Sequence, residues 1–447
     1  MTTERCFDKK MPVNLTTEVC GVRFRSPVVP AGGDIVSTVG NCKNMIAAGA
    51  GAITTKTYTS VEMPRSRPHP NTFALKGQGF EQGGALFSVI GNWPEHIDIV
   101  LKRDIPKFRN LCQRAGIPLI VSWYGPIEIT GGKLNRDVQG AWVEIAKKVE
   151  AAGADLQEIN LGCPLVSNAI KECPSAGFEL VKAVCDAGFP AGLKINPTWE
   201  PLEELAGGWV GAGAKFITAH NLDTMGLVID VEKEVPKYVP GVGGYSPGRL
   251  FLPWSLSRVA RIKKAVDIPV FAAGGVYTAE DALQYILCGA SVVEIHTAIY
   301  FRGLGILNQI NQDIKGWMKR KGYSSLDDFR GKVLPMVLSW LDVKNHEKYP
   351  YVVPPECPYV PVVDEKKCDL CRVCAACIHA VYKFEDDQLV IDESKCDNCG
   401  LCVTLCPKGA IRLVDKKDRK KVIWNGLDVM AAPFREMIRE KLGIEVP

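Results

Sequence analysis

The sequence predicts an α/β fold in which a (β/α)8 barrel is followed by a small, cysteine-rich α+β domain. From Pro27 onward, short apolar segments alternate with amphipathic segments of helical length, which is the pattern of βα units around a parallel sheet. Eight cysteines then crowd between Cys368 and Cys406 at metal-ligand spacing. A chain of 447 residues also exceeds the length that one core usually supports, so two domains are expected.

Eight apolar segments are predicted to form the strands, and eight strands with intervening helices fit a closed barrel better than an open doubly wound sheet. The segments are Val28 to Ala31, Gly51 to Thr57, Pro118 to Tyr124, Leu156 to Cys163, Ala191 to Pro197, Ala214 to Asn221, Pro269 to Gly275 and Val292 to Ile299. Helices are expected between them, among others over Gly140 to Ala152, Ala176 to Ala187, Ser255 to Ala265 and Ala279 to Leu287. We expect the barrel and its N-terminal extension over residues 1–325, a proline-rich linker over 326–360, the cysteine-rich domain over 361–415 and a C-terminal extension over 416–447.

The composition is that of a globular protein. With 47% hydrophobic residues, 23% charged residues and a net charge of +4, neither a nucleic acid nor a membrane surface is an expected partner. Asp8, Lys9 and Lys10 interrupt any secretory apolar core, and no apolar run is long enough to span a bilayer. We therefore expect a cytoplasmic protein whose clustered cysteines are metal ligands rather than disulfides.

Polar and glycine residues end most of the predicted strands, where barrel enzymes carry their chemistry. They are Gly32 after Ala31, Lys56, Ser122, Asn160, Cys163, Lys194, Asn221, Gly274, Gly275, His296 and Thr297. Lysines can simply fringe a barrel mouth and glycines can simply serve turns. Two lysines and two asparagines ending four separate strands nevertheless indicate a polar, flat ligand above them.

The segment from Glu158 to Pro164 is the centre of this pattern, because a buried strand stops there at a thiol followed by proline. A free cysteine in such a place is more often an inert packing residue than a reactive one. The residues at the other strand ends favour the reactive interpretation of Cys163.

A phosphate-bearing cofactor is predicted from glycine pairs at the expected places in the barrel order. Gly274 and Gly275 follow the seventh strand, and Thr297 follows the eighth, where bare backbone N–H groups and a hydroxyl cradle a phosphate in many barrels. Gly243 and Gly244 are expected to supply a second glycine-rich loop just before the seventh unit.

These motifs resemble the FMN-dependent dihydroorotate and dihydropyrimidine dehydrogenases over essentially the whole barrel. The matching motifs are Thr55-Lys56-Thr57, Asn160-Leu161-Gly162-Cys163-Pro164, Gly192-Leu193-Lys194, Thr218-Ala219-His220-Asn221, and Ala273-Gly274-Gly275-Val276 with Leu287-Cys288-Gly289-Ala290-Ser291. The resemblance implies that Lys56 and Lys194 contact the flavin, that Asn160 and Asn221 bind the substrate's ring amides, and that Cys163 exchanges a proton with the substrate carbon. Asn92 is the nearest candidate for a further amide contact in a segment that is expected to form part of the substrate lid.

Two cysteine runs predict iron–sulfur clusters in the second domain. The runs are Cys368-x2-Cys371-x2-Cys374-x2-Cys377 and Cys396-x2-Cys399-x2-Cys402-x3-Cys406-Pro407. The second is the bacterial ferredoxin pattern, in which three thiolates hold one [4Fe–4S] cluster and the fourth reaches the other. Zinc is the rival ligand for repeated Cys-x2-Cys, but the doubled pattern favours two [4Fe–4S] clusters. Cys377 is the least certain ligand, because its gap is one residue short of the pattern.

Electrons are expected to come from outside the chain. Gly208 to Gly213 lacks the G-x-G-x-x-G order and precedes a strand, so no dinucleotide site is predicted. The donor would be a ferredoxin or a reductase subunit with FAD and NAD(P)H, an arrangement that resembles the catalytic subunit of bacterial NAD-dependent dihydropyrimidine dehydrogenase. We also expect an oligomer.

Four functions remain open from the sequence. The leading hypothesis is reduction of a C=C bond conjugated to a carbonyl, with uracil or thymine as the family default. Leu165 and Leu222 stand where the family places polar residues, which favours a less polar conjugated or aromatic carbonyl compound as an alternative substrate. Dihydroorotate oxidation is a third possibility, and a flavin relay without its own chemistry is the non-enzymatic one.

Overall fold

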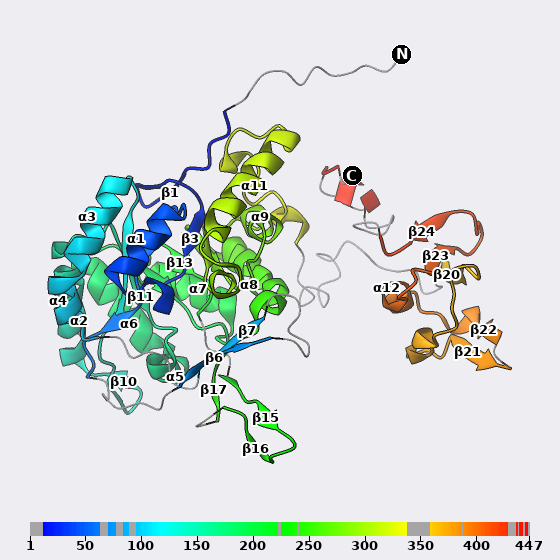
Figure 1. The fold of residues 1–447 in the computed structure, drawn as a ribbon, viewed down its shortest axis with the longest axis horizontal. Coiled ribbons are helices and arrows are strands. Elements are labelled where there is room, and N and C mark those ends of the chain that lie inside the picture. Colours follow the sequence, from blue (N-terminus) through cyan, green and yellow to red (C-terminus); the bar gives the residue numbers. More distant parts are fainter. Residues whose placement is uncertain are drawn as a thin grey trace. The chain divides into compact units, whose positions relative to one another are not determined.

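The computed structural model shows two compact units, Met1–Leu334 and Pro335–Pro447 (Figure 1). It describes residues 12–62, 70–76, 84–88, 95–221, 225–238, 241–337, 358–386, 388–427, 435–436, 438–440 and 443–445, with the backbone alone at Leu165. Within these residues, no helix combines the length and the apolar character needed to cross a bilayer.

The first unit contains a parallel barrel whose eight main strands follow the predicted segments. In chain order they are β3 (Val28–Pro30), β4 (Ile53–Thr54), β8 (Leu119–Tyr124), β11 (Leu156–Asn160), β12 (Ala191–Lys194), β13 (Ile217–Thr218), β18 (Val270–Ala273) and β19 (Val292–Ile295), and β5 (Tyr58–Thr59) extends the sheet beside β8. Their order in the sheet is β3-β19-β18-β13-β12-β11-β8-β4. The Gly51 N–H, just before β4, donates to the Val28 carbonyl in β3 at 2.8 Å, and this bond joins the two ends of the sheet. The predicted barrel is therefore confirmed.

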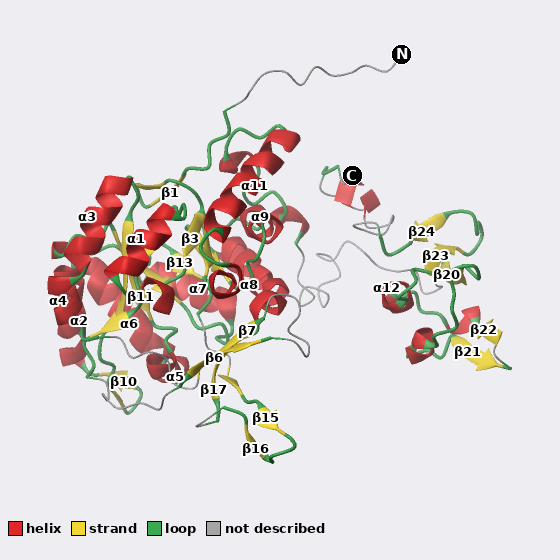
Figure 2. Ribbon diagram, in the orientation of Figure 1, coloured by secondary structure: helices red, strands yellow, loops and turns green. Residues whose placement is uncertain are grey.

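Helices surround the strands of this unit (Figure 2). They are α1 (Val39–Ala47), α2 (Ile97–Arg103), α3 (Ile105–Ala115), α4 (Arg136–Ala151), α5 (Pro164–Glu172), α6 (Pro174–Asp186), α7 (Leu202–Gly211), α8 (Leu252–Ala265), α9 (Ala279–Leu287), α10 (Thr297–Arg302) and α11 (Ile306–Lys321). In α4, for example, Val138, Trp142, Ile145 and Val149 recur at helical spacing and are all buried. This apolar stripe explains why the segment packs as a helix against the sheet.

Apolar rings fill the barrel near the starts of its strands. Phe216 stacks on Phe271 with ring centroids 4.5 Å apart, and Phe24 meets Phe271 edge-on at 5.9 Å. Phe24 belongs to an N-terminal hairpin of β1 (Thr17–Val19) and β2 (Val22–Phe24). Gly192 lies beside these rings, and a Cβ there would come within 2.2 Å of the Phe216 ring. The packed end leaves polar side chains to the opposite ends of the strands.

A small antiparallel sheet follows the carboxyl ends of the strands. Its order is β14 (Met225–Gly226), β17 (Gly243–Ser246), β7 (Ala85–Ser88) and β6 (Thr72–Leu75). Two further pairs of two-residue strands, β9 (Ile129–Thr130) with β10 (Lys133–Leu134) and β15 (Ile229–Asp230) with β16 (Val235–Pro236), form hairpins. The expected glycine-rich loop at Gly243 and Gly244 is thus wrong in form, because both residues pair with neighbouring strands.

The end of the first unit lies at Leu334, beyond the expected boundary at residue 325. Leu326 and Phe329 are buried in its core, and the Arg330 guanidinium donates to the Thr17 hydroxyl at 3.0 Å. Apolar burial and this hydrogen bond hold the segment to the barrel. The residues just after 325 thus pack with the first unit, and the bounds of the linker remain a prediction.

The second unit is built from short strands around the cysteines. It contains the sheet β20 (Tyr359–Val363), β23 (Ile411–Asp415) and β24 (Val422–Trp424), the hairpin β21 (Tyr382–Glu385) and β22 (Gln388–Ile391), and α12 (Leu401–Leu405). Because β24 pairs with β23, residues just after 415 belong to this sheet rather than to a separate extension. The predicted α+β class of the unit is confirmed.

Replacing Gly192 by alanine should destabilise the barrel by about 1–3 kcal/mol, because the added methyl group would overlap the Phe216 ring in a packed interior. The measurement is the urea midpoint of unfolding of the full chain. Gly207→Ala is the matched control: Gly207 lies inside α7 with nothing within 4 Å of an added Cβ, so this variant should gain about 0.5–1 kcal/mol from helix propensity. Equal shifts in the two variants would contradict the packing argument.

Candidate active site

A chain of hydrogen bonds joins the polar residues at the ends of neighbouring strands. The Asn160 side-chain amide donates to the Thr57 hydroxyl at 2.8 Å, and the Asn221 side-chain amide donates to Oδ1 of Asn160 at 3.1 Å. The Ser122 and Thr57 hydroxyls lie 2.9 Å apart. Four predicted strand ends therefore meet at one face of the barrel, as parallel strands require.

Lys194 lies inside the barrel between two glutamates. Its ammonium is 3.4 Å from Oε2 of Glu294 and 3.9 Å from Oε1 of Glu158. All three side chains are at least 95% buried. Burial disfavours the Lys194 ammonium, but the two carboxylates outweigh that effect and raise its pKa. Lys194 thus stays charged in the interior.

The two glutamates differ in their hydrogen bonds. Glu158 accepts from the Ser122 hydroxyl at 2.8 Å and from the Thr218 hydroxyl at 2.6 Å. Glu294 accepts from Lys194, while its Oε1 is buried and has no hydrogen-bond partner among the described residues. Burial raises the pKa of Glu294 to about 7, with a further contribution from the charge of Glu158 that Lys194 partly offsets.

The mouth of the barrel carries a second lysine. Lys56 forms an ion pair with Asp34, and both side chains are mostly buried. The adjacent backbone at Gly33 approaches the His296 ring so closely that a Cβ would lie 2.5 Å from Nε2. A Cβ at Gly32 would lie 2.7 Å from the Thr55 carbonyl oxygen. The turn after Ala31 therefore packs against the lysine segment and the end of β19 only because it contains glycines.

The glycine pair after β18 forms a tight turn against the start of α8. Gly274 and Gly275 have φ values of +109° and +75°, and a Cβ on Gly275 would lie 2.6 Å from the Leu252 nitrogen. The Thr297 hydroxyl, at the start of α10, lies 2.8 Å from the Ser246 hydroxyl at the end of β17. Thr297 is therefore a neighbour of the strand that contains Gly243 and Gly244, and the predicted glycine turn packs against the start of α8. A glycine turn beside helix starts and hydroxyls is a donor set suited to a phosphate.

Cys163 lies between the end of β11 and the start of α5. It is the N-cap residue of α5 and its side chain is half-buried. Gly162 is required before it, because a Cβ there would lie 2.6 Å from the Ile195 carbonyl carbon. Burial raises the pKa of the Tyr124 phenol, and a charged Cys163 raises it further, which makes these two side chains neighbours.

The sequence analysis did not predict four residues of this face: Asp34, Tyr124, Glu294 and Glu158, which it named only as part of a buried strand. Glu294 did leave a signal, since an acidic residue inside the apolar strand β19 requires a buried partner. Its partner Lys194 is 100 residues away in sequence, so no local pattern could identify the pair. The side chains of Asn92, Leu165 and Leu222 lie outside the described residues.

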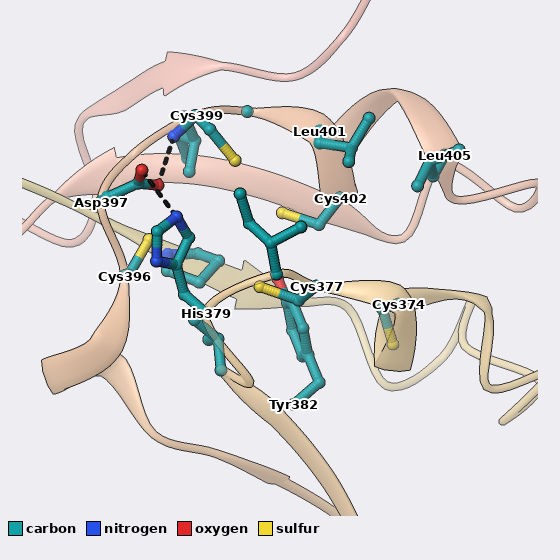
Figure 3. A pocket seen from close by; sticks show the side chains of 15 residues that line it. Cys374, Cys377, His379, Tyr382, Cys396, Asp397, Cys399, Leu401, Cys402 and Leu405 are labelled. Carbon is teal, nitrogen blue, oxygen red and sulfur yellow. Dashed lines mark hydrogen bonds and ion pairs between the residues drawn. The ribbon is translucent and has the colours of Figure 1, made fainter.

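The cysteines of the second unit line two cavities. One is lined by Cys377 together with Cys396, Cys399 and Cys402, and also by Cys374 (Figure 3). The other is lined by Cys368, Cys371, Cys374 and Cys406. The fourth cysteine of each run thus faces the cavity of the other run.

Hydrogen bonds to sulfur and a close histidine–aspartate contact support these cavities. The Ala410 N–H donates to the Cys406 sulfur at 3.2 Å, and the Asn398 side chain donates to the Cys396 sulfur at 3.3 Å. His379 and Asp397 both line the first cavity, and Nε2 of His379 lies 2.7 Å from a carboxylate oxygen of Asp397 (Figure 3). N–H groups directed at thiolates are a recurrent feature of iron–sulfur sites.

Comparison with known proteins shows the family to which the chain belongs. The profile of the family described as "Dihydroorotate dehydrogenase" matches residues 14–318. The chain belongs to the dihydroorotate dehydrogenase family. A second profile, "4Fe-4S binding domain", matches residues 389–412, so the second unit carries an iron–sulfur domain.

Relatives align with the barrel over most of their own length. The catalytic subunit of dihydroorotate dehydrogenase B (NAD(+)) from Methanocaldococcus jannaschii is 29% identical over 311 residues, which are 69% of this chain and 94% of the relative. The corresponding subunit from Pyrococcus abyssi is 29% identical over 72% of this chain and 99% of its own. Dihydroorotate dehydrogenase (fumarate) from Trypanosoma cruzi is 31% identical over 69% of this chain and 95% of its own.

Family membership confirms the predicted enzyme class, an oxidoreductase acting on CH–CH bonds, and supports FMN as its cofactor. The described residues fit that group, since the barrel face offers two ammonium groups, side-chain amides and a glycine turn. The earlier emphasis on dihydropyrimidine dehydrogenase is not supported, because these relatives are dihydroorotate dehydrogenases.

Acidification should destabilise the barrel through two histidines. Burial lowers the pKa of His220 to about 3, with Arg258 and Lys194 adding to the effect, and burial lowers the pKa of His296 to about 4. In the unfolded chain both would titrate near 6.5, so below that pH the unfolded chain binds more protons than the folded one. The contribution of the two neutral histidines to the free energy of unfolding is therefore complete above pH 6.5. Below that pH the free energy of unfolding should fall by up to about 1.4 kcal/mol per histidine for each pH unit.

Thermal unfolding measured between pH 7.5 and 4.5 tests this. The His220→Gln variant should lose stability less steeply than the wild-type protein over that range. The reason is that it lacks one of the two histidines that the fold keeps neutral and that gain a proton on unfolding. An unchanged pH profile in this variant would contradict the assignment.

Proposed function

We propose that the chain is the catalytic subunit of an FMN and iron–sulfur oxidoreductase that interconverts a C–C and a C=C bond beside a ring carbonyl, with dihydroorotate and orotate as the first substrate pair to test. The observation that carries the proposal is the hydrogen-bonded pair Asn160 and Asn221, on the barrel face where β11 leads into Cys163. Family membership supports the choice of dihydroorotate.

The cofactor would be held by residues from all sides of the barrel mouth: Ala31, Gly32, Lys56, Ser122, Lys194, Gly243, Gly244, Gly274, Gly275, His296 and Thr297. The bound flavin supplies a site that accepts or gives up a hydride. The glycine turn, Thr297 and Ser246 would bind its phosphate through N–H and O–H donors. The lysines would stabilise negative charge on the ring system.

Cys163 would hold and move the proton at the substrate carbon. Its sulfur lies at the N-terminal end of α5, where the helix dipole stabilises a thiolate. As a thiolate it removes a proton from the dihydro substrate, and as a thiol it returns one in the reverse direction. Tyr124 beside it is buried and helps to exclude water from the sulfur.

Asn160 and Asn221 would orient the substrate ring. Each side-chain amide presents one acceptor and two donors, which matches the alternating N–H and C=O groups of a pyrimidine ring. Their mutual hydrogen bond and the bond from Asn160 to Thr57 fix both amides before substrate binds. Preorganised donors and acceptors of this kind reject ligands that leave them unpaired.

An uncharged pyrimidine such as uracil or thymine is the second candidate substrate. The specific observation is that both lysines of the site are already paired with carboxylates, Lys56 with Asp34 and Lys194 with Glu158 and Glu294. A carboxylate on the substrate would compete with these pairs. This pairing favours a neutral ring, whereas family membership favours dihydroorotate.

We further propose two [4Fe–4S] clusters, one in each cysteine cavity. Cys368, Cys371, Cys374 and Cys406 would bind one, and Cys377, Cys396, Cys399 and Cys402 the other. No three His, Cys, Asp or Glu side chains in the described ranges converge as ligands of a single metal ion. Thiolates spread around the wall of a cavity suit a cluster better than a tetrahedral zinc ion.

Electrons would pass between the clusters and an external partner, either a ferredoxin or a reductase subunit with FAD and NAD(P)H. The names of the relatives from Methanocaldococcus jannaschii and Pyrococcus abyssi state a catalytic subunit and NAD(+), which supports a separate partner subunit. The clusters carry single electrons and the flavin exchanges pairs, so the chain would couple the two kinds of transfer. An assembly with such a partner fits the expected oligomer.

The test is anaerobic flavin reduction by dihydroorotate, dihydrouracil and dihydrothymine, followed by absorbance. The proposal expects reduction by at least one of them, and Cys163→Ala should slow it by about 10²- to 10⁴-fold while the flavin stays bound. Cys173→Ala is the matched control, because this thiol lies at the other end of α5 and bonds only to the Gly132 carbonyl and the Ser175 hydroxyl among described partners. An undiminished rate in Cys163→Ala would contradict the proton role, and no reduction by any of the three would contradict the substrate class.

Replacing Cys377 by alanine should remove one cluster and leave the other. Iron content should fall from about eight to about four per chain, with loss of one of two paramagnetic signals on reduction. Cys185→Ala, which removes a half-buried thiol from α6, should keep all the iron. Full iron content in Cys377→Ala would exclude Cys377 as a ligand.

A further inference from the structure

The interior of the barrel holds more negative than positive charge. Glu158 and Glu294 face a single ammonium, that of Lys194, and the exposed fraction of each of the three side chains is between 0% and 4%. An uncompensated buried charge costs several kcal/mol. One of the two carboxyl groups is therefore better accommodated with a proton than without one.

The hydrogen bonds show which carboxyl group that is. Glu158 accepts from two hydroxyls, on Ser122 and Thr218, and such acceptance stabilises the anion. Glu294 accepts from Lys194 at 3.4 Å, the Thr54 hydroxyl lowers its pKa only as the smallest of the effects on it, and its Oε1 is buried with no hydrogen-bond partner of good geometry among the described residues. Ionising Glu294 therefore costs more free energy than ionising Glu158. The pKa of Glu294, raised to about 7 by burial, agrees.

The elements around Glu294 bring few other titratable groups to it. Its neighbouring strands β3 and β18 contribute only Val28, Val29, Pro30, Val270, Phe271, Ala272 and Ala273. Across the interior, Lys194 comes from β12 and Glu158 from β11, while β4 brings the Thr54 hydroxyl. Lys56, Asp34 and His296 lie at the mouth, and His220 follows β13. Glu294 thus responds chiefly to the charge around Lys194.

We propose that Glu294 is a redox-linked proton acceptor, which binds a proton when the FMN of this barrel is reduced and releases it when the FMN is oxidised. Reduction by two electrons with one proton adds one negative charge to the flavin. A second proton, taken from water by the Glu294 carboxylate, cancels that charge inside the barrel. The overall uptake is two electrons and two protons, with the electrons supplied by the dihydro substrate or the clusters.

This inference rests on FMN binding as set out in the proposed function, but not on the identity of the substrate. In this role Glu294 does not contact the flavin. Its protonation changes the net charge around Lys194, and Lys194 acts on the flavin. A merely structural role for Glu294 would alter stability and leave the number of protons taken up per flavin unchanged. Proton stoichiometry therefore separates the two roles.

The experiment is a potentiometric titration of the flavin in the full-length holoenzyme at a series of pH values from 6 to 8.5. In the wild-type protein the midpoint potential should fall with pH about twice as steeply above pH 7 as below it, because the second proton is taken up only where Glu294 is ionised in the oxidised protein. Glu294→Gln, which cannot ionise, should keep the shallow slope throughout. A break that persists in Glu294→Gln, or a wild-type slope with no break, overturns the proposal.

Asp34→Asn is the matched control, since it also removes a carboxylate from the site but lies at the mouth beside Lys56. It should shift the midpoint potential by the same amount at every pH and keep the break. Loss of the break in Asp34→Asn would overturn the assignment to Glu294.

A second measurement covers the case in which Glu294→Gln does not fold. The reduced-minus-oxidised infrared spectrum of the wild-type holoenzyme at pH 8 should show a protonated carboxyl group gained on reduction, and its absence overturns the proposal. A chain that binds no flavin overturns both the proposed function and this inference. A flavin-loaded chain that turns over no pyrimidine overturns only the substrate, because the slope still decides the role of Glu294.

Discussion

The ion pair of Lys194 with Glu158 and Glu294 is the interaction on which the candidate site depends. Charged groups inside a barrel are tolerated only when partners are held at short range. Here the partners come from β11, β12 and β19, and hydroxyls from β8 and β13 complete the hydrogen bonds of Glu158. The requirement to compensate one buried ammonium therefore ties together five strands below the face where the chemistry is proposed.

That arrangement divides the barrel into two ends with different roles. The rings of Phe24, Phe216 and Phe271 fill the end near the strand starts, where apolar packing supplies stability. The opposite end carries Asn160, Asn221 and Cys163. Polar groups at this end of a barrel are typical of ligand binding rather than of packing. The second unit supplies a different chemistry, because thiolates lining two cavities suit carriers of single electrons.

Periodicity and strand-end chemistry predicted the architecture well. All eight strand segments lie where the apolar runs indicated, and Lys56, Asn160, Lys194 and Asn221 do lie at one end of the strands. The packing of residues 326–334 with the first unit and the strand at Gly243 were not predicted, for one reason. Both depend on contacts between distant segments, such as Arg330 with Thr17 and Gly244 with Ser88, and no local pattern reports these.

By itself, the sequence determined the order of βα units, the cysteine spacing and the residue types at each strand end, because these follow from local periodicity and short motifs. Only the tertiary structure decided that Cys377 faces the cavity of the second cysteine run, that Tyr124 lies beside Cys163, and that Lys194 sits between two buried glutamates. The physical reason is that charge compensation and cavity lining are properties of side chains brought together across the barrel and across the cysteine domain. Their partners are tens to a hundred residues apart in the chain, and folding alone makes them neighbours.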